Sequence, residues 1–249
     1  MKIVFDSNVW EKVVDSEAEP YRTINMKIRG NLLVPFICEA AISLEQIPKM
    51  HRAGFFKTYK PKFEFKDTQS VDNRVCTEFS ISPNNELHPG LPEVLISKLA
   101  LAQRLGFKVI HMNRFGTVRT NEIPKDMYVQ FDENGGFWRR AELFSECVKF
   151  IEKMGGGQSK YSRFKQEFGL SDGTLQIPEN KRNAFIKAIA EWSDGDSIAA
   201  CYSMGIHLFC TDDRGQNAGC SSVFFPDNIK KISERFEVEV ISSARAAEL

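Results

Sequence analysis

Long apolar runs and an excess charge of one sign are both missing from this chain of 249 residues. No stretch approaches the roughly 20 apolar residues of a membrane span, and the first apolar run stops at Asp6, so we expect neither a span nor a signal peptide. The 33 Lys and Arg residues balance 33 Asp and Glu residues. Binding to a polyanion must therefore come from local patches, not from overall charge.

Closely spaced cysteine pairs are missing as well. None of the six cysteines forms a C-x-x-C pair, which argues against a zinc site. Several, such as Cys210, lie in apolar surroundings, which is typical of free thiols in a reducing compartment. We therefore expect a cytoplasmic protein.

Short apolar strands alternate with helical patterns along the chain. This alternation predicts an α/β fold with a central parallel sheet between two helical layers. The expected strands cover residues 2–5, 32–34, 107–112, 206–210 and 238–241. A helix is expected from about residue 36 to residue 50. Another should begin at Pro178 and break at residues 193–196, where a new helix starts.

The middle of the chain is harder to assign. Residues 62–66 and 75–81 are typical of exposed strands, and the glycine triplet at residues 155–157 resembles a linker. We expect residues 51–157 to be largely an insertion in a domain built from residues 1–50 and 158–249.

Carboxylates follow the predicted strands. In a parallel sheet the carboxyl ends of the strands share one edge, where ligands bind. Several carboxylates close together cannot all be charged without a counter-charge, so either some are protonated or a cation lies among them. Oxygen ligands without Cys or His favour Mg²⁺ or Mn²⁺. Such ions activate water and bind phosphoryl oxygens, so a phosphodiester is the expected substrate. The candidate ligands are Asp6, Glu39, Asp196 and Asp213, with Asp194, Asp212 and Glu45 as second choices.

Each acid also has an ordinary structural interpretation. Asp194 or Asp196 could cap a helix, and Glu39 could be favoured in the first turn of its helix by the helix dipole. Asp213 could belong only to a turn. Asp6 is harder to explain in this way, because an acid after a buried strand is costly without a partner. The joint pattern favours the metal site.

Two motifs resemble those of the PIN-domain nucleases. Asp6-Ser7-Asn8 is similar to the opening motif of that family. Residues 196–200, Asp-Ser-Ile-Ala-Ala, together with the Gly, apolar strand and Thr-x-Asp of residues 205–213, are similar to its closing motif. The resemblance covers about residues 1–50 and 178–245.

The resemblance implies a metal-dependent endoribonuclease that leaves 5′-phosphate and 3′-hydroxyl ends. It implies metal binding by Asp6, Asp196 and Asp213, with supporting roles for Asn8 and Thr211. The fourth acid would be Glu39, with Glu45 as the alternative. Many relatives are toxins neutralised by an antitoxin protein, so such a partner is an open expectation, as is a homodimer.

A basic and aromatic segment is the first candidate for RNA binding. Residues 49–66 hold six Lys and Arg against one acid, with Phe and Tyr interleaved, a composition that suits single-stranded RNA. Lys57, Lys60 and Lys62 are the candidate contacts, and a packed, solvated surface is the alternative.

Two other functions stay open beside the ribonuclease. A catalytically silent PIN-like module could bind RNA or protein, and a nuclease of this type could act on DNA. A phosphohydrolase of the haloacid-dehalogenase type needs Asp-x-Asp after the first strand, and Asn8 at the third place counts against it.

Overall fold

A parallel sheet of five strands forms the centre of the computed structural model, which describes residues 1–249 apart from 70–74, 115–116, 131–135, 214 and 216–218. The strand order is β5-β2-β1-β6-β7, and every neighbouring pair is parallel. The predicted α/β fold with a central parallel sheet is therefore confirmed. The strands are β1 (Lys2–Phe5), β2 (Val34–Cys38), β5 (Lys108–Ile110), β6 (Leu208–Cys210) and β7 (Glu239–Ile241).

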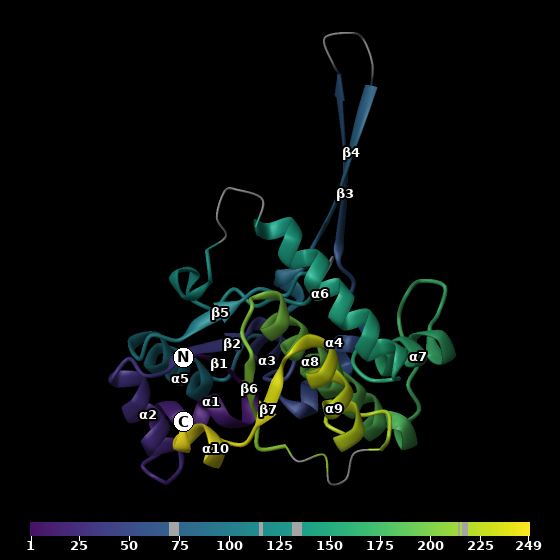
Figure 1. Cartoon of the computed structure of the whole chain (residues 1–249). Coiled ribbons are helices and arrows are strands. Elements are labelled where there is room, and N and C mark those ends of the chain that lie inside the picture. Colours follow the sequence, from purple (N-terminus) through teal and green to yellow (C-terminus); the bar gives the residue numbers. More distant parts are fainter. Residues whose placement is uncertain (70–74, 115–116, 131–135, 214, 216–218) are drawn as a thin grey trace.

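Helices cover both faces of the sheet (Figure 1). Successive side chains of a strand point to opposite faces, so Ile3 and Phe5 enter one core while Val4 enters the other. The core of Ile3 and Phe5 is closed by α1 (Ser7–Asp15), α2 (Tyr21–Arg29), α5 (Glu93–Arg104) and α10 (Ser243–Glu248). The other core is closed by α4 (Lys49–Thr58), α6 (Gly136–Lys153), α7 (Ser159–Phe168), α8 (Arg182–Ser203) and α9 (Pro226–Phe236).

Strand β2 lies further along the chain than its predicted position at residues 32–34. It pairs with β1 in the register Ile3↔Pro35 and Phe5↔Ile37, so the apolar residues 36–38 belong to the sheet. The predicted helix over residues 36–50 is divided as a result. Its first part is α3 (Glu39–Ser43), its last residues begin α4, and Glu45 lies in the connection between them.

Helix α8 continues through residues 193–196, where we expected a break. Gly195 lies against Gly157, and a Cβ atom added at Gly195 would be 2.9 Å from the Gly157 Cα atom. Glycine permits this close approach of two backbones. The glycine triplet is buried under α8 instead of forming an exposed linker.

The segment expected as an insertion contributes to the main body. It supplies the edge strand β5 and helices α5 and α6, and α6 packs along α8. The antiparallel ribbon of β3 (Lys62–Gln69) and β4 (Val75–Ser82) projects from the body (Figure 1). Three short 3₁₀ turns complete the described elements: η1 (Asn85–Leu87), η2 (Lys125–Met127) and η3 (Glu179–Lys181).

Among the described residues, no helix has both the length and the apolar character needed to cross a membrane.

Candidate metal centre

Asp6 occupies the carboxyl end of the central strand β1 and caps α1. Its Oδ1 accepts a hydrogen bond from the backbone N–H of Ser7 at 2.7 Å. Its Oδ2 accepts hydrogen bonds from Asn8 Nδ2 at 2.9 Å and from Thr211 Oγ1 at 2.6 Å. Asn8 and Thr211, the two residues expected in supporting roles, therefore both contact Asp6. The Asp6 side chain is almost fully buried, and these hydrogen bonds hold its carboxylate in one orientation.

Two further carboxylates meet Asp6 at this edge of the sheet. One carboxyl oxygen each from Asp6, Glu45 and Asp194 lie within 4.8 Å of one another. Glu45 comes from the connection between α3 and α4, and Asp194 comes from the middle of α8. The Oε2 atom of Glu45 is buried without a hydrogen-bond partner. Three chain segments thus place acids around one small volume, which we call the acidic centre.

Burial and mutual repulsion both disfavour the charged forms of these acids. Burial, followed by the charge of Asp6, raises the pKa of Glu45 from 4.5 to about 8. Burial, followed by the charges of Glu45 and Asp6, raises the pKa of Asp194 well above its ordinary value. Burial also raises the pKa of Asp6, against the hydrogen bonds that favour its charged form. A bound cation would offset the free-energy cost of ionising these buried acids.

Asp213 lies beside the acidic centre, and Asp212 lines the same pocket as Asp194 and Asp213 while hydrogen-bonded to α2 and α10. The charge of Asp213 raises the pKa values of Asp6 and Asp194, while Asp213 itself is exposed. Asp212 accepts hydrogen bonds from the Tyr21 hydroxyl at 2.7 Å and from the Ser243 backbone N–H at 3.0 Å. Asp212 therefore joins β6 to α2 and α10.

Glu39 lies in a separate polar cluster near β5. Its carboxylate accepts hydrogen bonds from the Tyr128 hydroxyl at 2.8 Å and the Met112 backbone N–H at 3.1 Å. Arg119 Nε is 3.2 Å from Glu39 Oε1. Glu39 is fully buried, has a cationic partner and is not among the three acids whose oxygens lie within 4.8 Å of one another. Metal binding by Glu39 stays a prediction.

Asp196 is also fully buried and paired. Nε of Arg114 is 2.9 and 2.8 Å from its two carboxyl oxygens, and Arg114 Nη2 is 2.7 Å from Oδ1. Trp192 Nε1 donates a further hydrogen bond at 2.9 Å. These contacts use both carboxyl oxygens and join α8 to the segment after β5. Metal binding by Asp196 stays a prediction.

The position of a residue around its helix separates Asp194 from Asp196. Residues i and i+2 of an α-helix are about 200° apart around its axis, so the side chains of Asp194 and Asp196 leave nearly opposite faces of α8. A continuous helix can bring only one of them to Asp6. The choice between Asp194 and Asp196 could be predicted from the sequence only if residues 193–196 were known to be helical. Gly195 argued for a break there instead.

A pocket opens at the acidic centre. It has a volume of about 840 Å³, and Asp194 and Asp213 are part of its lining. Asp194 is the member of the acidic centre that lines this pocket, with Asp212 and Asp213 beside it, so a ligand of several atoms would reach the centre through Asp194.

The three lysines expected to bind RNA contact the protein itself. Nζ of Lys57 donates to the carbonyl of Ile177 at 3.5 Å, and Nζ of Lys60 donates to the carbonyl of Asp172. Lys62 forms an ion pair with Glu64 at 2.9 Å. Phe56 is buried, whereas Phe63 and Phe65 are exposed, and RNA binding by this segment stays a prediction.

The donor set of the acidic centre fits a hard divalent cation. Asp6, Glu45 and Asp194 offer only carboxyl oxygens, the ligands that Mg²⁺ and Mn²⁺ prefer. None of the three forms an ion pair with a Lys or Arg side chain in the part of the chain that the structure describes. Glu39 and Asp196, by contrast, each have an arginine partner.

Comparison with known proteins gives no relative of this chain: no family model, no curated protein and no solved structure matches it.

Proposed function

We propose that this chain is a divalent-metal-dependent endoribonuclease of the PIN-like type. Asp6, Glu45 and Asp194 would hold Mg²⁺ or Mn²⁺, and Asp213 would assist from the rim of the pocket. The observation that carries the proposal is the meeting of one carboxyl oxygen each from three acids within 4.8 Å of one another, with no ion pair to these acids among the described residues. An arrangement that is costly without a cation is typical of a metal site.

The residues of the chain prepare this site before any ligand enters. Ser7, Asn8 and Thr211 hold the Asp6 carboxylate in one orientation, so little ordering is needed on binding. The unpartnered Oε2 of Glu45 keeps a coordination position available. A bound Mg²⁺ or Mn²⁺ supplies activation of water and polarisation of a phosphoryl oxygen.

The assignment to RNA comes from the two motifs that resemble the PIN-domain nucleases. Asp6-Ser7-Asn8 lies at the end of β1, and Thr211-Asp212-Asp213 follows β6. Strands β1 and β6 are neighbours in the sheet, which places the two motifs side by side. Their meeting supports the proposal of a nuclease centre, with one difference from the resemblance: the helix supplies Asp194 instead of Asp196.

Cleavage of a labelled single-stranded RNA tests this function. The full chain should cleave it with Mn²⁺ or Mg²⁺ and stop in EDTA. Glu45→Gln and Asp194→Asn should each reduce cleavage by at least about 100-fold while keeping cooperative thermal unfolding. Asp227→Asn, at an exposed acid of α9, is the matched control and should keep full activity.

The products and the metal dependence decide the outcome. We expect 5′-phosphate and 3′-hydroxyl ends. Undiminished cleavage by both ligand variants, or cleavage that persists in EDTA, would contradict the proposal. A parallel assay on DNA of the same sequence shows whether RNA is the preferred substrate.

A further inference from the structure

One wall of the pocket at the acidic centre is basic. Four residues of α7 line it at the spacing i, i+3, i+4 and i+7, so they form one face of the helix. They are Lys160, Arg163, Phe164 and Glu167. Asp194, Asp212 and Asp213 belong to the lining of the same pocket. A ligand in the pocket would therefore meet the acidic centre and basic side chains at the same time.

Lys187 extends this basic surface along helix α8. Lys187 precedes Asp194 by seven residues, which is about two helical turns, so both lie on nearly the same face. The rise between them is about 10 Å. Lys187 and Ala190 also line a second pocket of about 620 Å³, together with Lys49 and Arg182. The two pockets are thus adjacent along α8, with Lys187 between them.

Not every cation on this surface is available to a ligand. Lys160 Nζ is 3.0 Å from Glu191, and the Glu191 carboxylate also accepts hydrogen bonds from Ser222 Oγ and the Val223 backbone N–H. Arg163 and Lys187 are exposed, and neither has a carboxylate partner within ion-pair distance among the described residues. A phosphate group would therefore gain the most electrostatic stabilisation beside Arg163 and Lys187.

A larger pocket elsewhere offers a useful contrast. It has a volume of about 990 Å³ and is lined in part by Arg114 and Arg119. These two guanidinium groups are already paired with the buried carboxylates of Asp196 and Glu39. That pocket also lies away from the acidic centre, since neither Asp194 nor Asp213 lines it. The charges of Arg114 and Arg119 are used by these buried ion pairs, whereas those of Arg163 and Lys187 face solvent.

We propose that Arg163 and Lys187 form a phosphate track that leads a single-stranded polynucleotide over Asp194 and Asp213. The inference rests on the proposed function, because the track gives the negatively charged strand a reason to approach an acidic centre. Phosphates on either side of the bond at the metal would contact the two cations. Phe164 is half-buried and lines the same pocket, and its ring is available for stacking by a base.

Binding of a fluorescent single-stranded RNA of mixed sequence tests the track. Anisotropy is measured in EDTA over a series of salt concentrations, so that cleavage does not contribute. Each phosphate contact on a single strand adds about 0.7 to the salt slope of the affinity. The double variant Arg163→Gln and Lys187→Gln should therefore lower the slope by about 1.4 and weaken binding at low salt at least about tenfold.

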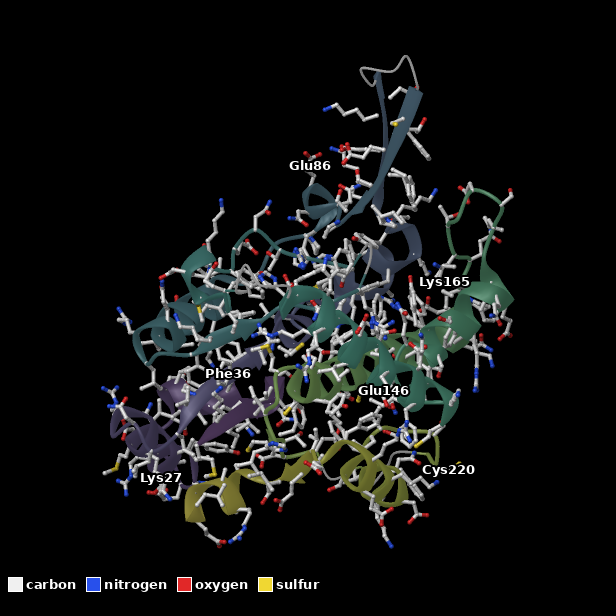
Figure 2. The ribbon with its side chains drawn as sticks, turned by 45° about the horizontal axis from the view of Figure 1, so that its top comes forward. Lys27, Phe36, Glu86, Glu146, Lys165 and Cys220 are labelled. Atoms are coloured by element: carbon white, nitrogen blue, oxygen red, sulfur yellow. The ribbon has the colours of Figure 1, made fainter. Side chains whose placement is uncertain are left out.

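Matched variants separate the track from overall charge. Lys165, on α7 (Figure 2), and Lys231, on α9, are exposed and line neither pocket. Lys165→Gln with Lys231→Gln removes the same charge and should keep the slope. Arg163→Lys with Lys187→Arg should keep it too. Single-stranded DNA of the same sequence shows whether the track requires the ribose hydroxyl.

The outcomes distinguish this inference from the proposed function. An unchanged slope in the Arg163 and Lys187 double variant, or an equal loss in the Lys165 and Lys231 pair, overturns the track. Metal binding is measured separately by thermal unfolding with Mn²⁺, and the double variant should keep it. If the slope falls as expected while the wild-type chain shows neither a metal shift nor cleavage, the track stands and the nuclease proposal fails.

Discussion

Asp194 and Asp196 lie two residues apart on α8, yet they take part in opposite electrostatic arrangements. Asp194 meets Asp6 and Glu45 with no basic side chain paired to it, and its pKa is raised by burial and by those two acids. Asp196 is held by the guanidinium group of Arg114 at 2.7 Å. One turn of helix thus carries a candidate metal ligand on one face and a structural ion pair on the other.

This contrast predicts opposite effects of two similar substitutions. Asp194→Asn removes a repelling charge, so the metal-free protein should unfold at a higher temperature and respond little to Mn²⁺. Asp196→Asn leaves Arg114 buried without its main partner and should cost about 3–5 kcal/mol of stability. Thermal unfolding with and without Mn²⁺ measures both. A larger loss of stability in Asp194→Asn than in Asp196→Asn would reverse the two assignments.

Substitution of Glu39 and of Glu45 should change the stabilisation by Mn²⁺ differently in the same assay. At a Mn²⁺ concentration 100 times its dissociation constant, binding should stabilise the wild-type chain by about 2.7 kcal/mol. Glu45→Gln should lose most of this gain. Glu39→Gln should lower the starting stability, because Arg119 loses its charged partner, but keep the Mn²⁺ shift. A lost shift in Glu39→Gln with a full shift in Glu45→Gln would move the metal site to the Glu39 cluster.

The raised pKa of Glu45 predicts how the stability of the metal-free protein depends on pH. The folded protein holds the Glu45 proton up to about pH 8, whereas the unfolded chain releases it near pH 4.5. The folded state therefore binds more protons between these values, and this contribution to stability falls as pH rises. Unfolding temperatures in EDTA should decline from pH 5 to pH 8, and Glu45→Gln should decline less. Equal slopes in both proteins would show that Glu45 is charged in the folded state.

Two glycine substitutions should change stability in opposite directions. Gly195→Ala would place its Cβ atom 2.9 Å from the Gly157 Cα atom and should cost about 1–3 kcal/mol. Gly54, inside α4, has no atom within 4 Å of an added Cβ atom. Gly54→Ala should therefore stabilise the protein by about 0.5–1 kcal/mol, since alanine favours the helix. Chemical denaturation measures both, and a neutral Gly195→Ala would show that α8 can move away from Gly157.

The sequence by itself determined the sheet and one end of the candidate site. The apolar run before Asp6 predicts the central strand, and the run before Thr211 predicts its neighbour β6, because fully buried parallel strands consist of such runs. Since parallel strands end at a common edge, the acids after these strands were predicted to share that edge, and the resemblance implied supporting roles for Asn8 and Thr211, which both contact Asp6. Local pattern and chain direction are sufficient for that result.

Only the tertiary structure decided which helical acids join Asp6. The sequence favoured a break near Gly195, but packing against Gly157 supports a continuous helix there, and continuity directs Asp194 to the acidic centre. The register of β2 against β1 likewise places Glu45 in the connection after α3 and leaves Glu39 to Arg119. A shift of one or two residues in a helix or strand redirects a side chain to another face. The contacts that fix those shifts join residues far apart in the sequence.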